Sequence, residues 1–151
     1  MNRLLDLIGK VPQPFRFIVS SGPSTEITLP KNCVGKDFVE QEATLSCSDL
    51  MISHGGNNTL TECFHMGVKL IIMPLFSDQP DNAQRLVDLG LGYRLNPFTC
   101  TEDQLNQTII EALENDELTR KMQSISQRIR TDNGMHAVVK ELHDLILLES
   151  V

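Results

Sequence analysis

The sequence predicts an α/β fold in which a parallel sheet is flanked by helices. Two short apolar runs, at residues 50–52 and 69–76, each lead into a polar or Gly-rich turn and then into a segment that reads as helix. After Thr101, three apolar stripes keep helical spacing. This alternation of strands and helices is typical of a doubly wound, Rossmann-like sheet whose strands run parallel.

The expected elements follow one another in a regular order. A helix that contains Leu4 to Ile8 ends at Gly9, and residues 24–32 form a polar connection. Strands are expected at residues 15–20, 34–39, 50–53, 69–74 and 93–95. Short helices are expected at residues 41–48, 59–66 and 80–89, the last one stopping at Gly90.

The C-terminal third is expected to be helical. Thr101 and Gln104 form a capping box at the start of the first helix. Residues 131–134 interrupt the helical pattern before the last helix. The three stripes are expected to lie in the core, and they consist of Leu105, Ile109 and Leu113; Leu118, Met122, Ile125 and Ile129; and Val138, Leu142, Leu145 and Ile146.

Composition limits the classes of function. A chain of 151 residues with 40% hydrophobic and 22% charged residues is expected to form a single domain, residues 1–151. A net charge of −7 argues against nucleic acid as a partner. No run approaches the roughly 20 apolar residues of a membrane span. Because no signal peptide is visible and the four cysteines lack paired spacing, a cytoplasmic location with reduced thiols is expected.

The segment from Ser53 to Glu62 carries the main chemical signal. Gly55 and Gly56 follow a strand and precede a helix, so the backbone can turn tightly and approach a ligand. The first amides of that helix lack partners and lie at the positive end of its dipole, which makes an anion site, most often for phosphate. His54, Asn58 and Thr59 supply further donors.

A second polar turn follows the next strand. Asp78 and Gln79 come just after the run that ends at Phe76. Neighbouring parallel strands present their carboxyl ends at one edge of the sheet, where open α/β folds bind ligands. A carboxylate and an amide beside a phosphate cradle suggest a ligand with hydroxyls beyond its phosphates, as in a nucleotide sugar.

These residues resemble the signature of the UDP-glycosyltransferase family, also called glycosyltransferase family 1. The resemblance covers about residues 32–95 and rests on the runs 53–62, 74–79 and 81–85. It implies the C-terminal, donor-binding half of a GT-B fold. By this resemblance, His54, Gly55, Gly56, Asn58 and Thr59 form the turn that binds the diphosphate, Glu62 binds the ribose hydroxyls, and Asp78 with Gln79 binds the sugar.

The same resemblance assigns a base-binding element. The family has a Trp-x-Pro-Gln sequence whose ring stacks on uracil and whose next residue bonds the base through its backbone. The matching positions are Phe38, Val39, Glu40 and Gln41, with Phe in place of Trp and Glu in place of Pro. Phe38 can still stack, with less area. Glu40 brings a negative charge toward an anionic ligand or swings away to solvent.

Two parts of the family pattern are missing from the sequence. One is the N-terminal half, which carries the acceptor pocket and the catalytic histidine. The other is the Gly-Ser-rich strand that opens the donor half, so the sheet is expected to lack its first strand and to have unpaired edges. The chain is therefore expected to bind a UDP-sugar for inverting transfer to a hydroxyl of a small lipophilic acceptor. An acceptor-binding domain would be supplied in cis or in trans. No catalytic residue, metal or cofactor other than this donor substrate is assigned.

Several alternatives remain open at the level of sequence. Thr59 and Glu62 also form a capping-box pattern, Asp78 could cap a helix, and Phe38 could be core. A metal site from His54, Cys63 and His65 matches no standard zinc spacing. The chain could be a non-catalytic or degenerate nucleotide-sugar-binding module, or a donor subunit that needs a separate acceptor chain. A dehydrogenase is disfavoured, because no G-x-G-x-x-G follows an early strand.

Overall fold

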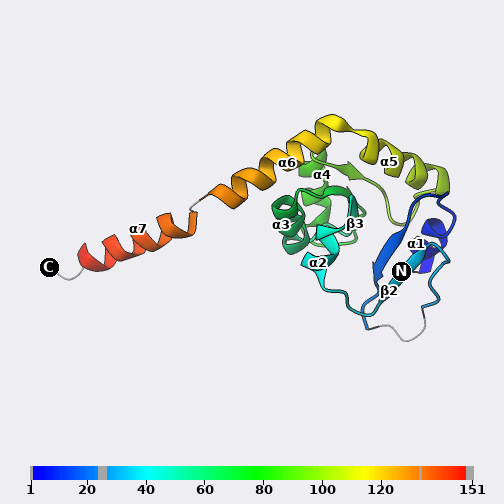
Figure 1. Cartoon of the computed structure of the whole chain (residues 1–151), viewed down its shortest axis with the longest axis horizontal. Helices are drawn as coiled ribbons and strands as arrows, with labels where there is room; N and C mark the ends of the chain where they lie inside the picture. Colours follow the sequence, from blue (N-terminus) through cyan, green and yellow to red (C-terminus); the bar gives the residue numbers. More distant parts are fainter. Residues whose placement is uncertain (1, 24–26, 133, 149–151) are drawn as a thin grey trace.

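Five short parallel strands and seven helices make up the described part of the chain. The structure is a computed structural model that describes residues 2–23, 27–132 and 134–148 (Figure 1). The strands are β1 (Phe17–Ser20), β2 (Cys33–Lys36), β3 (Leu50–Ser53), β4 (Lys69–Ile72) and β5 (Tyr93–Arg94). The helices are α1 (Asn2–Ile8), α2 (Gln41–Ser46), α3 (Asn57–Met66), α4 (Gln79–Asp88), α5 (Glu102–Glu114), α6 (Asp116–Thr131) and α7 (Gly134–Leu148).

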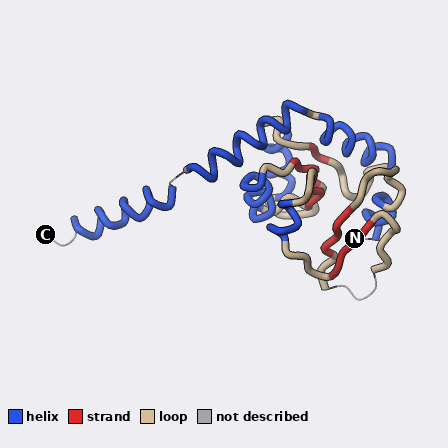
Figure 2. The backbone as a smooth tube through the Cα atoms, in the orientation of Figure 1, coloured by secondary structure: helices blue, strands red, loops and turns tan. Residues whose placement is uncertain are grey.

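The strands fall into two groups that are not hydrogen-bonded to each other. β1 pairs with β2, while β3, β4 and β5 form a second sheet in that order, and all pairs are parallel (Figure 2). The predicted α/β class is confirmed, and so is the expectation of unpaired strand edges. In the described part of the chain, no ladder joins β1 to β3.

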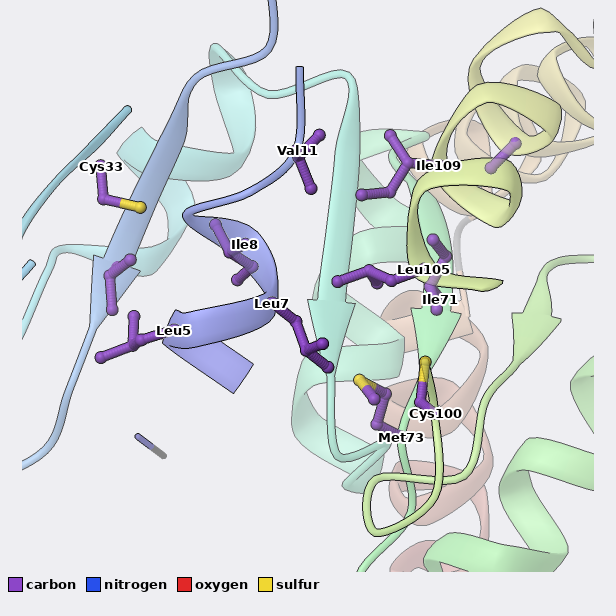
Figure 3. Close-up of a cluster of buried hydrophobic side chains, with 12 residues drawn as sticks. Leu5, Leu7, Ile8, Val11, Cys33, Ile71, Met73, Cys100, Leu105 and Ile109 are labelled. Atoms are coloured by element: carbon purple, nitrogen blue, oxygen red, sulfur yellow. The ribbon is translucent and has the colours of Figure 1, made fainter. Parts of the chain in front are cut away.

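Two hydrophobic clusters cover the two faces of β4. Ile71 and Met73 belong to the first cluster, which contains side chains of α1 and α5 (Figure 3). Leu70 and Ile72 belong to the second, which contains side chains from helices α2, α3, α4 and α6. Because successive side chains of a strand point to opposite faces, a run of apolar residues here fills both clusters. Every residue of β4 is therefore buried, and the strand holds the loop that follows it in a fixed position.

Helix starts in the C-terminal third follow their side-chain caps. The predicted capping box is confirmed, because the Thr101 hydroxyl accepts from the Gln104 amide while the Gln104 side chain accepts from the Thr101 amide. Asn115 caps α6 by accepting from the Leu118 amide at 2.9 Å. Leu105, Ile109, Leu118 and Met122 are buried as expected.

The third apolar stripe is not in the core, so that prediction was wrong. Val138 is 56% exposed and Leu142 is 54% exposed, while Ile129 near the end of α6 is also exposed. α7 extends away from the two sheets and their flanking helices (Figure 1), so its apolar stripe does not reach a sheet. The side chain of Leu145 lies outside the described residues, as does residue 133 in the predicted break.

The described helices include none that is long and apolar enough to cross a membrane. Cys33, Cys63 and Cys100 are buried, and Cys47 is exposed; all four are free thiols in the structure. Burial raises the pKa of Cys63 from 9.0 to about 12, with a smaller contribution from the nearby Glu62 carboxylate.

Candidate functional site

The candidate site lies where β3 and β4 end. The two strands are parallel neighbours, with Ser53 opposite Ile72, so the turns that follow them emerge at the same edge. Met73 donates its amide to the Ser53 carbonyl at 2.8 Å, which carries the pairing up to that edge. The sequence prediction that the two polar turns are adjacent is thus confirmed.

The turn after β3 requires glycine at position 55. Gly55 has a φ of +86°, a conformation that side chains rarely adopt. A Cβ atom placed there would lie 2.5 Å from Cγ2 of the buried Ile72. The Gly55 amide donates to the Ser53 hydroxyl at 3.2 Å, which stabilises the turn from within. The backbone is therefore held in one shape directly before α3.

The start of α3 offers unpaired amides. Gly56 is the N-cap residue and has no side chain to accept from the helix, so the structure shows no side-chain cap there. Asn57 and Asn58 at this end are exposed. Since the first amides of a helix have no intrahelical acceptors, they remain available to an anion, with the helix dipole adding to the attraction.

His54 lies beside these amides. Its side chain is exposed, and its Nε2 atom is 2.7 Å from the position of a Cβ atom built on Gly56. The imidazole therefore covers the space over Gly56 that a larger residue would fill. An anion at the start of α3 would have both backbone donors and an imidazole nitrogen within the same small region.

Gln41, Thr59 and Glu62 come together although they are distant in sequence. The Gln41 amide Nε2 donates to the Glu62 carboxylate and lies 3.4 Å from the Thr59 hydroxyl. α2 packs against α3, which brings the loop after β2 to the side of the candidate site. The capping-box interpretation of Thr59 and Glu62 is wrong, because α3 begins two residues before Thr59 with Gly56 as its N-cap.

The loop between β2 and α2 presents an aromatic ring to solvent. Phe38 is 67% exposed, so the alternative that it belongs to the core is wrong. Val39 is half-buried. The Glu40 carboxylate accepts from the Ala43 amide at 2.6 Å and thereby caps α2. The charge that replaces the family proline is therefore held at a helix N-terminus, where it is stabilising.

Asp78 is connected to the glycine turn through Asn82. The Nδ2 atom of Asn82 lies 3.0 Å from the Asp78 carboxylate, 3.0 Å from the Gly55 carbonyl and 3.1 Å from Oδ1 of Asn57. Asp78 stands at the N-cap of α4, but its side chain makes no capping bond. Asn82 is a site residue that the sequence reasoning did not single out. The available signal was its spacing of four residues from Asp78 on one helix face.

Gln79 lies inside the site's supporting loop. Its side chain is only 5% exposed, and its Oε1 atom accepts from the amides of Leu75 at 2.9 Å and Phe76 at 3.1 Å. Ser77, which lies between Phe76 and Gln79, has a φ of 59°, which is uncommon for a residue with a side chain. Gln79 thus fixes the loop that carries Asp78, and only its Nε2 atom is left to donate to a ligand.

Other positions on the surface do not add to this site. The metal combination of His54, Cys63 and His65 is not assembled, because no three His, Cys, Asp or Glu side chains gather in the described residues. Cavities of about 410 and 600 Å³ open beside α6 and α5, and neither is lined by a predicted site residue. The candidate site is an exposed edge of the sheet.

A parallel sheet with a glycine turn and an uncapped helix start at its carboxyl edge is typical of α/β domains that bind phosphate-containing ligands. Comparison with protein families identifies the chain further. Residues 10–140 match the family described as glycosyltransferase family 28 C-terminal domain, and the chain belongs to this family.

Known proteins agree with that assignment. The chain is 32% identical over 135 residues to the Bacillus subtilis protein named UDP-glucosyltransferase YdhE. The match covers 87% of this chain and 34% of that protein. The chain is 30% identical over 146 residues to human 2-hydroxyacylsphingosine 1-beta-galactosyltransferase, covering 94% and 26%. The solved structure of spinosyn forosaminyltransferase SpnP superposes with a TM-score of 0.82 at 25% identity, covering 96% and 38%.

The chain thus spans about a quarter to a third of the length of the curated relatives it matches. Its fold is that of the Rossmann-like C-terminal half of GT-B glycosyltransferases, as the superposition with SpnP shows. The resemblance seen in the sequence is confirmed at the level of GT-B glycosyltransferases. The narrower assignment to the UDP-glycosyltransferase family, family 1, remains a prediction.

Proposed function

We propose that this chain binds a UDP-sugar donor for inverting glycosyl transfer to a hydroxyl of a small lipophilic acceptor, as the donor half of a family 1 type glycosyltransferase. The observation that carries the proposal is the uncapped start of α3 beside His54, next to an edge where Asp78 is connected to the glycine turn. Family membership supports nucleotide-sugar transfer in general.

The diphosphate would lie at the start of α3. Backbone amides at residues 56–59, the His54 imidazole and the side chains of Asn58 and Thr59 would donate to its oxygens. The backbone donors are held in place before any ligand arrives, since Gly55 and Ser53 fix the turn. Fixed donors directed at a departing UDP can contribute several kcal/mol to the rate, about 3–4 for a single donor in known cases. The residues present require no metal for this step.

Ribose and uracil would extend toward the loop between β2 and α2. Glu62 would accept from the ribose hydroxyls, and Gln41 already orients its carboxylate. The exposed ring of Phe38 would stack on uracil, and the backbone of Val39 would bond the base. In this arrangement the three parts of UDP would lie along one path from α2 to α3.

The sugar would lie against Asp78 and Gln79. The Asp78 carboxylate would accept from sugar hydroxyls. Gln79 would donate through Nε2, because its Oε1 atom is already engaged by two loop amides. Holding the sugar in one orientation relative to the attacking hydroxyl is itself a large catalytic term. The attacking group and its base would come from an acceptor-binding domain in cis or in trans.

The relatives' names agree with a lipophilic acceptor. They include the human 2-hydroxyacylsphingosine galactosyltransferase, the zeaxanthin glucosyltransferase of Pantoea ananas and the sterol 3-beta-glucosyltransferase of Komagataella phaffii. Those names describe acceptors of the relatives. For this chain they support the proposed acceptor class.

Calorimetric titration of the purified chain with UDP and with UDP-glucose tests the proposal. The variants His54→Ala and Glu62→Ala should weaken both ligands about 10- to 100-fold, the effect of losing a hydrogen bond to a charged group. Asp78→Ala should weaken UDP-glucose much more than UDP. Glu111→Ala on α5, outside the site, is the matched control and should change neither.

The absence of UDP binding by a wild-type chain with a cooperative unfolding transition would contradict the proposal. The non-catalytic, degenerate module would then be the better interpretation. If Asp78→Ala weakens UDP and UDP-glucose equally, only the assignment of Asp78 to the sugar is contradicted, and the assignment of the UDP-binding residues is not.

A further inference from the structure

Two consecutive large apolar side chains are exposed on the loop that follows β4. Leu75 is 50% exposed and Phe76 is 68% exposed. Single apolar residues on a surface are common, but neighbouring ones beside a ligand site are typical of a surface that binds something. These two precede Ser77 and Asp78, and Asp78 is the exposed carboxylate proposed to bind the sugar. They therefore form an apolar surface beside the proposed sugar site.

Hydrogen bonds fix the loop that carries this exposed pair. The amides of Leu75 and Phe76 both donate to Oε1 of the buried Gln79, at 2.9 and 3.1 Å. The Gln79 amide in turn donates to the Phe76 carbonyl at 3.3 Å, which closes a turn of four residues. Three hydrogen bonds thus hold the backbone that presents the two apolar side chains to solvent.

The same turn limits how far the pair lies from a bound sugar. Asp78 lies two residues after Phe76, so their Cα atoms are at most about 7 Å apart. Before transfer, the attacking hydroxyl must come within about 3–3.5 Å of the anomeric carbon. A sugar held by Asp78 therefore brings the body of the acceptor into the neighbourhood of Phe76.

A third exposed ring lies on the neighbouring loop. β5 pairs with β4, so the loops after the two strands emerge side by side at one edge. Met73 in the first loop and Cys100 at the end of the second belong to the same hydrophobic cluster (Figure 3). Phe98 in the second loop is 70% exposed, and its amide donates to Oδ1 of Asn96 at 2.8 Å. Two adjacent loops thus present large apolar side chains at this edge.

We propose that Leu75 and Phe76 contact the apolar body of the acceptor next to its attacking hydroxyl. This inference rests on the proposed function, because Asp78 holds the sugar toward which that hydroxyl points. The occupant is a small lipophilic molecule, since the surface continues directly from the sugar site and such sites combine apolar walls with a few polar groups. Acceptor selection then depends on this chain as well as on the acceptor-binding domain.

Glucosides of two chain lengths test the inference, because a β-glucoside is the product of inverting transfer from UDP-glucose. Hexyl and methyl β-D-glucoside are each titrated into the full chain saturated with UDP, and binding is followed by NMR. The hexyl compound should bind at least about tenfold more tightly, the gain from burying roughly two of its additional methylene groups. Intermolecular NOEs should connect the hexyl chain with the ring of Phe76.

Paired substitutions show whether the gain comes from this surface. Leu75→Ser combined with Phe76→Ser should reduce the ratio of the two dissociation constants to about one. The matched control combines Val138→Ser and Leu142→Ser, whose side chains are 56% and 54% exposed on α7, away from the sheets (Figure 1). The control should keep the wild-type ratio. A cooperative urea transition establishes that each variant is folded.

The outcomes separate this inference from the proposed function. If UDP does not bind, both are wrong. If UDP binds but the hexyl chain adds no affinity, or adds as much in the Leu75→Ser/Phe76→Ser variant, the UDP site stands and the acceptor surface is overturned. Sedimentation provides a second measurement. A dimer of the wild-type chain that this double variant abolishes would assign the surface to a second copy and would also overturn the inference.

Discussion

A methyl group added at Gly55 meets two separate penalties. The backbone φ of +86° is unfavourable for any residue with a Cβ atom, by roughly 1–2 kcal/mol. The new atom would also lie 2.5 Å from Cγ2 and 3.2 Å from Cδ1 of Ile72, a fully buried side chain of β4. Relieving such a contact in a packed core costs about 1–3 kcal/mol. Gly55→Ala should therefore lower the free energy of unfolding by about 2–5 kcal/mol.

Two other glycines separate these penalties. Gly22 has a φ of +71°, but a Cβ atom there would meet nothing within 4 Å, so Gly22→Ala should show the backbone penalty alone. Gly56 has an ordinary φ of −67°, and its Cβ atom would approach only the exposed His54 ring. The free energy of unfolding of Gly56→Ala should stay within about 1 kcal/mol of wild type, because the main cost is that Ala is a weaker N-cap residue than Gly. The substitution should nevertheless weaken UDP binding.

Urea unfolding followed by circular dichroism gives the three free energies on one scale. The expected order of destabilisation is Gly55→Ala, then Gly22→Ala, then Gly56→Ala. If Gly55→Ala is no less stable than Gly22→Ala, the contact with Ile72 is not a constraint and the reasoning about the turn is refuted. If Gly56→Ala binds UDP as wild type does, the space over Gly56 is not part of the phosphate site.

Four further predictions concern the support of the site, a helix start and the cysteines. Gln79→Ala leaves two loop amides without an acceptor, so it should destabilise by about 1–3 kcal/mol and speed the hydrogen exchange of those amides. Thr101→Ala removes the capping box and should lower the free energy of unfolding by about 1 kcal/mol. In native chain at pH 8, a thiol reagent should modify Cys47 and leave Cys63 unmodified. Since the folded-state pKa of Cys63 is raised from 9.0 to about 12, its contribution to stability is complete below pH 9 and is lost as the pH rises toward 12. Cys63→Ala should flatten that part of the pH profile.

Local patterns in the sequence were sufficient to predict most of the fold. All five strands and the helices between them are present, with ends that differ by a few residues. The cap explains the accurate start of α5, because a Thr cap acts within its own turn. Strand ends were less accurate. The expected strand at residues 69–74 stops at Ile72, where pairing with β5 runs out, although Met73 and Pro74 are still buried.

The stripe in α7 shows where pattern alone is insufficient. Val138 and Leu142 keep helical spacing, and the helix does form. Periodicity identifies which residues share a helix face, but it does not say whether another element covers that face. Here the helix extends past the sheet and the described side chains of the stripe are exposed.

In the candidate site, sequence predicted the features that depend on neighbours in the chain. The glycine turn and the uncapped helix start involve consecutive residues, and both are present. The contacts of Gln41 with Glu62 and of Asn82 with Gly55 join residues 21 and 27 positions apart. Such pairs depend on how α2 packs against α3 and on how α4 lies beside the turn, which no local pattern specifies.

A shared residue type does not settle which atoms are available to a ligand. The resemblance assigns Gln79 to the sugar, yet its carbonyl oxygen is bonded to two backbone amides, so only donation from Nε2 can reach a ligand. Glu40, which stands where the family has proline, could have brought a negative charge toward an anionic ligand. Its carboxylate instead accepts from the amide of Ala43 at the start of α2. In both cases a local bond to the backbone defines what the side chain can contribute. It follows that Gln79→Glu, which keeps an acceptor for the loop amides and removes the donor, is the substitution that separates support of the loop from contact with the sugar. It should retain the stability of the loop while weakening UDP-glucose relative to UDP in the same titration.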